Sequence, residues 1–145
     1  MAITSAICTS FKQELLVGTH NFTATTGNTF KIALFTSSAT LGASTTAFAT
    51  TNEITNSSGT AYTSGGATLT NITPTTDSTT AVCDFTDVSF TSASFTANGA
   101  LIYNSSASNK AVAVIAFGGD KTVSSGTFTI QFPAAKATDA MIRLA

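Results

Sequence analysis

Residues 111–117 read Ala-Val-Ala-Val-Ile-Ala-Phe, and the next four residues are Gly-Gly-Asp-Lys. A run that is apolar on both faces predicts a central strand, or a strand covered by a partner. The glycine pair behind it predicts a turn. Residues 122–132 then place Phe128, Ile130 and Phe132 at every second position, which is the period of a half-buried strand. This part of the chain therefore predicts β-structure.

The same pattern extends outward to most of the chain. Glycine, proline and asparagine clusters predict turns at residues 56–60 and 74–78, and Gly65 and Gly66 predict a hairpin between residues 61–63 and 67–72. About eight short strands separated by turns predict one all-β domain, an antiparallel β-sandwich or jelly-roll-like barrel over residues 19–145. The other expected strands are residues 29–36, 80–90, 95–103 (with a turn or bulge at Asn98 and Gly99) and 140–144.

One helix is expected, at residues 5–17, where Ile7, Phe11 and Leu15 recur at four-residue spacing. Ser5 is the candidate N-cap, and Gly18 is expected to end the helix.

Residues 1–18 therefore form an expected N-terminal arm or helix with two possible roles. It could cover the β core, or it could dock on a neighbouring molecule. For the second role the candidate partner-binding side chains are apolar, namely Ile3, Ile7, Phe11 and Leu15. The loop at residues 37–52 is a second candidate surface, because long loops tend to carry contacts.

The composition limits the possible functions. Charged residues make up only 9% of the 145 residues and the net charge is −1, whereas nucleic-acid and anionic-membrane binding need clustered Lys and Arg. About a third of the chain is Ser or Thr, and an uncharged polar face can be covered by a neighbouring subunit at modest cost. The 11 phenylalanines argue for a folded core rather than a disordered chain. The N-terminus has no basic and apolar signal-peptide pattern, so synthesis in a cytoplasm is expected.

No constellation of residues predicts catalysis, a cofactor or a metal site. His20 is the single histidine and is expected to be structural or on the surface. Asp84 and Asp87 are three residues apart on an expected strand, so they should point to opposite sides. A weak calcium site at Glu53, near Asn52 and Asn56, is a minor alternative.

The cysteines, and the aromatic residues other than phenylalanine, give little indication of function. Cys8 and Cys83 are isolated, so buried thiols are expected, although a disulfide stays open. Carbohydrate binding is not supported, because the chain has no Trp and only two Tyr, and it is not excluded either.

Four stretches carry a resemblance to a known group of proteins. They are residues 2–16 (Ala-Ile-Thr-Ser-Ala-Ile-Cys-Thr-Ser-Phe-Lys-Gln-Glu-Leu-Leu), 30–36 (Phe-Lys-Ile-Ala-Leu-Phe-Thr), 100–104 (Ala-Leu-Ile-Tyr-Asn) and 127–133 (Thr-Phe-Thr-Ile-Gln-Phe-Pro). The chain resembles short Ser/Thr/Ala-rich virion structural proteins of tailed bacteriophages, which are common in phages of aquatic bacteria.

This resemblance implies a non-enzymatic capsid decoration or cement protein on the outer surface of the virion. The implied partners are the major capsid protein and further copies of the chain, as a homotrimer that bridges adjacent capsomers. Nucleic acid, membrane and small-molecule substrates are not expected as partners, and no cofactor is expected. The main alternative is a tail or fibre component that contacts the host surface, and copy number per particle would separate the two. A glycan hydrolase and a cellular adhesin are weaker alternatives.

Overall fold

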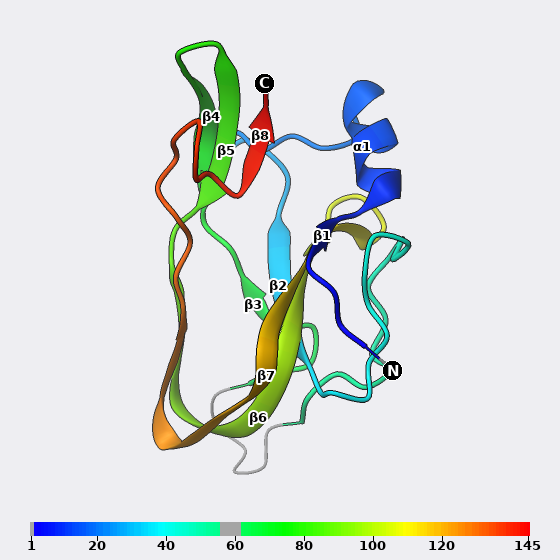
Figure 1. Cartoon of the computed structure of the whole chain (residues 1–145), viewed down its shortest axis with the longest axis vertical. Helices are drawn as coiled ribbons and strands as arrows, with labels where there is room; N and C mark the ends of the chain where they lie inside the picture. The colour runs from blue at the N-terminus through cyan, green and yellow to red at the C-terminus, as the bar shows by residue number, and fades with distance from the viewer. Residues whose placement is uncertain (1, 56–61) are drawn as a thin grey trace.

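The computed structural model describes residues 2–55 and 62–145, and in them the chain is an all-β sandwich with one short helix. Both sheets are antiparallel, as expected (Figure 1). The larger sheet has the strand order β1-β7-β6-β2-β3 and the smaller has β4-β5-β8. The strands are β1 (Ala6–Ile7), β2 (Phe30–Phe35), β3 (Ala67–Thr68), β4 (Asn71–Asp77), β5 (Thr80–Phe85), β6 (Val88–Asn104), β7 (Lys110–Ile130) and β8 (Ile142–Leu144), and the helix is α1 (Thr9–Leu16).

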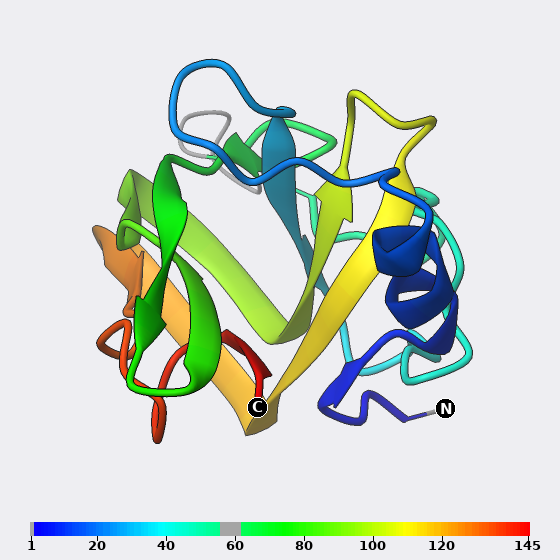
Figure 2. The same ribbon diagram turned by 90° about the horizontal axis from the view of Figure 1, so that it is seen from above.

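One long hairpin, β6–β7, dominates the fold. In the inner half of the hairpin, residues 99–104 of β6 pair with β7 on one side and with β2 on the other. In the outer half, residues 88–97 of β6 extend beyond β2 and pair with β7 alone. Figure 2 shows the hairpin bent into a V, with β2 beside one arm and the β4–β5 hairpin beside the other.

The bend coincides with a large bulge. Ala97 pairs with Lys121 and Gly99 pairs with Ala116, so four residues of β7 lie opposite Asn98 alone. Within that bulge Gly118 and Gly119 have φ values of 76° and 143°, which L side chains rarely adopt. The expected bulge at Asn98 is thus confirmed. The turn expected at residues 118–121 is wrong, because the chain passes through it and stays in β7.

Other boundaries also differ from expectation. Pro74 lies within β4 at a register shift, and the turn falls at residues 78–79 instead. Residues 86–87 divide the expected strand at 80–90 into β5 and the start of β6. The hairpin expected around Gly65 is wrong, because β3 pairs with β2; residue 61 and the turn expected at 56–60 lie outside the described residues.

The helix is shorter than predicted. Ala6 and Ile7 form β1 and pair with Val114 and Ala113 of β7, so the helix begins only at Thr9. The proposed cap is wrong as well, because Ser5 Oγ accepts a hydrogen bond from the backbone N–H of Ala116. Pairing with β7 satisfies backbone groups of Ala6 and Ile7 that would otherwise need helical partners. The predicted boundary at residue 18 between an arm and the sandwich stays a prediction.

Phenylalanines build the core in two groups. The first lies between α1 and β5, where Phe22 and Phe30 stack with ring centroids 4.3 Å apart and Phe85 packs on both. The second lies inside the outer half of the long hairpin, where Phe95 contacts the rings of Phe90, Phe128 and Tyr62. Because aromatic burial supplies much of the apolar area, these groups fix both arms of the V.

The backbone of Gly66 lies so close to the backbone of Ile32 that a residue with a side chain would not fit. A Cβ atom there would lie 1.9 Å from the carbonyl oxygen of Ile32, and φ is 80°. We expect Gly66→Ala to lower the free energy of unfolding by about 3 kcal/mol, because it combines left-handed strain with a backbone clash. Urea denaturation measures this.

The matched control is Gly118→Ala. Its φ is also positive, but no atom lies within 4 Å of the added Cβ. Strain alone should lower the free energy of unfolding by about 1 kcal/mol. Equal losses for the two variants would contradict the close approach at Gly66.

Candidate functional site

A buried polar cluster joins α1 to the large sheet. Nε2 of His20 lies 2.8 Å from Oε2 of Glu14, and Nδ2 of Asn104 lies 3.0 Å from Nδ1 of His20. Nζ of Lys110 lies 3.3 Å from the other oxygen of Glu14. The Asn104 amide also donates to Asn28 and accepts from the N–H of Ser106, which fixes its orientation, so Nε2–H of His20 donates to Glu14. Since the side chain of His20 is 0% exposed, it anchors the helix and does not face solvent.

Glu53 organises the turn before β3. Its Oε1 accepts hydrogen bonds of 2.6 Å from the Tyr62 hydroxyl and from the N–H of Gly65, and its Oε2 accepts one of 2.9 Å from Ser64. Burial, and then the hydrogen bond to Glu53, raises the pKa of Tyr62. The Glu53 oxygens are therefore occupied by the protein itself.

This arrangement does not support the minor hypothesis of a calcium site at Glu53. The Asn52 amide donates to the carbonyl of Ser38, and Asn56 lies outside the described residues. Across residues 2–55 and 62–145, no group of three His, Cys, Asp or Glu side chains could hold a metal ion.

Aspartates fasten the C-terminal segment to the small sheet. Oδ1 of Asp87 accepts from the N–H of Phe132, and Oδ2 of Asp77 accepts from the N–H of Ala137. Asp84 is buried in β5, whereas Asp87 is exposed and lies between β5 and β6, so the expectation that both belong to one strand is wrong. Burial raises the pKa of Asp84; the N–H groups of Phe85 and Met141 oppose this shift, and the charge of Asp87 adds to it. These acids act as structural acceptors.

Both cysteines are free and buried, as expected. Burial, with a smaller contribution from Glu14, raises the pKa of Cys8 to about 11. Burial, with a smaller contribution from Asp84, raises the pKa of Cys83 to about 12. Both thiols therefore stay protonated at neutral pH and are poor nucleophiles.

The four predicted partner-binding side chains lie against the core. Phe11 is 1% exposed, and its ring is 4.8 Å from that of His20. Ile3, Ile7 and Leu15 are partly buried, and Ile3 fills the space above Gly99, at the bend of the hairpin. Whether these residues bind a partner stays a prediction; in the described conformation Phe11 is part of the core.

The most exposed apolar residues at the end of the N-terminal helix were not among the predicted partner-binding side chains. Leu16 and Val17 follow Leu15 and are 88% and 67% exposed. Leu144 of β8 and Ile72 of β4 are the other large exposed apolar side chains of the described chain. Leu15 and Leu144 line one groove of about 110 Å³ between the helix and the small sheet. We call Leu16, Val17 and Leu144 the apolar end; the end of α1 and the C-terminus lie at the same end of the molecule (Figure 1).

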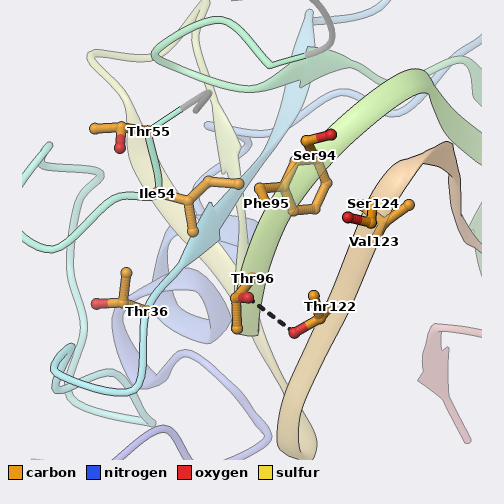
Figure 3. Close-up of a pocket in the computed structure, with 9 residues that line it drawn as sticks. All are labelled: Thr36, Ile54, Thr55, Ser94, Phe95, Thr96, Thr122, Val123 and Ser124. Carbon is orange, nitrogen blue, oxygen red and sulfur yellow. Dashed lines mark hydrogen bonds between the residues drawn. The ribbon is translucent and has the colours of Figure 1, made fainter. Parts of the chain in front are cut away.

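A pocket of about 390 Å³ lies on the outer half of the long hairpin (Figure 3). Its lining brings together residues from β6, β7, the segment after β2 and the loop before residue 56. Six of the nine side chains carry hydroxyl groups and the other three are apolar, so none is charged. The lining residues are Thr36, Ile54, Thr55, Ser94, Phe95, Thr96, Thr122, Val123 and Ser124.

No family model, curated protein or solved structure matches this chain. In the described part of the chain, no helix is long and apolar enough to cross a membrane.

Asp84 makes the stability depend on pH in a defined direction. Because its pKa is raised in the folded state, the folded protein binds more protons than the unfolded chain above about pH 4. The carboxyl therefore favours folding at low pH, and that contribution is lost as pH rises through the folded-state pKa. We expect Asp84→Asn, which keeps an acceptor for the N–H of Phe85, to be more stable than the wild type at pH 7.

Urea denaturation across pH 4 to 7 measures this effect. The stability difference between Asp84→Asn and wild type should grow with pH. A constant or shrinking difference for Asp84→Asn would contradict the assigned direction.

Proposed function

We propose that this chain is a non-enzymatic structural protein of a tailed-phage virion that decorates the outer surface of the capsid and bridges adjacent capsomers. The observation that carries the proposal is the apolar end, where large apolar side chains are exposed. Such a surface suits repeated contact between identical subunits.

The occupant that we assign to the apolar end is a second copy of the chain. Leu16 is 88% and Leu144 is 57% exposed, so both side chains are accessible to a partner. With a net charge of −1, two copies repel each other little. In addition, β8 is the last strand of its sheet, so its outer backbone edge is open to pairing.

Closed symmetry extends this contact to a homotrimer. In a cyclic trimer each copy uses the same two patches, so a modest contact is repeated around the ring. A trimer that binds one capsid junction through all three copies then binds with an avidity well above the affinity of a single copy.

The rest of the surface suits an interface with the major capsid protein. Ser and Thr hydroxyls solvate it without charge, so covering it costs less than burying Lys and Glu. A domain that binds the assembled shell but not free subunits stabilises the shell by mass action. The loop at residues 37–52, with its pocket of about 440 Å³, is the candidate surface for this contact.

A tail or fibre component that contacts the host is the second candidate. The hydroxyl-lined pocket on the long hairpin favours it, because a recognition surface needs a concave site with directed polar groups.

The apolar end gives a direct test of self-association. We expect the wild type to sediment as a trimer and Leu16→Ser/Leu144→Ser to sediment as a monomer, because two exposed apolar contacts are lost from each interface. Analytical ultracentrifugation measures this, with circular dichroism to establish that the variant is folded. The control Ala134→Ser, at an exposed position between β7 and β8 and outside the 37–52 loop, should remain trimeric.

The same variants test the function. When added to particles that lack the chain, the wild type and Ala134→Ser should co-sediment with them, and the double variant should bind more weakly because avidity is lost. A folded double variant that still assembles would exclude the apolar end as the contact. A wild type that does not bind particles would overturn the proposed function.

A further inference from the structure

The hydroxyl-lined pocket on the outer half of the β6–β7 hairpin has a size and lining of its own. Its volume of about 390 Å³ falls in the range of small-molecule sites. Four separate stretches of the chain contribute to it, and Figure 3 shows the side chains of Ile54 and Phe95 at its centre with the hydroxyls around them. It is therefore a feature of the tertiary fold and not of one loop.

Protein contacts hold several of these hydroxyls in place. The hydroxyls of Thr96 and Thr122 lie 2.8 Å apart across the strands, and Thr36 Oγ1 donates to the carbonyl of Asn52. Ser94 Oγ accepts from the N–H of Ser125. A hydroxyl has one donor and two acceptor sites, so the hydroxyls of Thr96 and Thr122 keep capacity for a ligand while their positions are set.

The centre of the pocket is apolar. Ile54 and Phe95 are almost completely buried, and Val123 is half-buried beside them. The ring of Phe95 is itself fixed by the rings of Tyr62 and Phe128, at centroid distances of 6.1 and 5.1 Å. A ligand that fits has C–H groups in its middle and hydroxyls at its edge, which describes a sugar ring.

A second pocket of about 320 Å³ lies beside the first, because Ile54 and Thr55 line both. Its far wall carries Glu53 and Tyr62. Among the described residues that line the two pockets, Glu53 is the one charged side chain and none is Lys or Arg. This lining offers no cationic partner to phosphate, sulfate or acidic sugars.

We propose that this hydroxyl-lined groove binds a neutral glycan, with one hexose ring held in it. The hydroxyls of Thr96 and Thr122 hydrogen-bond this ring. This site is separate from the apolar end, so it does not depend on the proposed role in the virion.

The hairpin supplies a matched pair of substitutions for the test. Thr122→Val removes a hydroxyl whose partner is Thr96, within the groove. Thr129→Val removes a hydroxyl from the same strand whose partner is Ser89, 2.9 Å away and outside the groove lining. Valine keeps the shape and β-propensity of threonine, so both variants should fold.

The measurement is a titration of the ¹⁵N-labelled full chain with neutral probes (maltotriose, cellotriose, lactose and tri-N-acetylchitotriose) and with acidic 3′-sialyllactose, followed by amide chemical shifts. We expect a neutral probe to shift amides of residues 53–55, 94–96 and 122–124. Thr122→Val should weaken binding about tenfold, Thr129→Val should bind as the wild type does, and sialyllactose should bind more weakly than lactose.

Two results would overturn the proposal. One is the absence of saturable shifts in these residues with all four neutral probes. The other is equal binding by Thr122→Val and the wild type, which would place the sugar outside the groove.

Discussion

The bend in the β6–β7 hairpin is the constraint on which the rest of the structure depends. Four residues of β7 stand opposite Asn98, and the two glycines among them take φ values that L side chains rarely adopt. The bulge turns one hairpin into two arms, with β2 beside one arm and the small sheet beside the other. The N-terminal segment is built onto this bend, because Ile3 packs where Gly99 leaves no room for a Cβ. The hydroxyl-lined groove lies on the outer arm, just beyond the bend.

Local patterns in the sequence predicted the fold class and several elements, because alternation and apolar runs report on burial directly. Residues 29–36 and 140–144 contain β2 and β8 as expected. The glycine pair at 118–119 was misread as a turn, since a glycine pair serves a turn and a bulge equally well and only the long-range register separates them. The helix was drawn too long for a related reason: the pairing of Ala6 and Ile7 with β7 joins residues more than a hundred positions apart and leaves no local signal.

The candidate sites were harder to predict than the fold. Nothing near His20 in the sequence indicates that Glu14 and Asn104 will meet it in the core. The groove collects Thr36, Ile54, Phe95 and Thr122 from four distant stretches, and in a chain so rich in Ser and Thr no single hydroxyl stands out. The apolar end had a visible signal in the consecutive Leu-Leu-Val at residues 15–17, where an eight-residue helix cannot turn all three side chains inward.

The central claim is that many copies of this chain bind an assembled shell. The most direct test is a cryo-electron microscopy reconstruction of particles that carry the chain, with particles that lack it as the reference. Our account predicts extra density with the shape of this sandwich, in groups of three, at the junctions between capsid subunits over the whole shell. Extra density confined to the tail, or no difference between the two reconstructions, would contradict it.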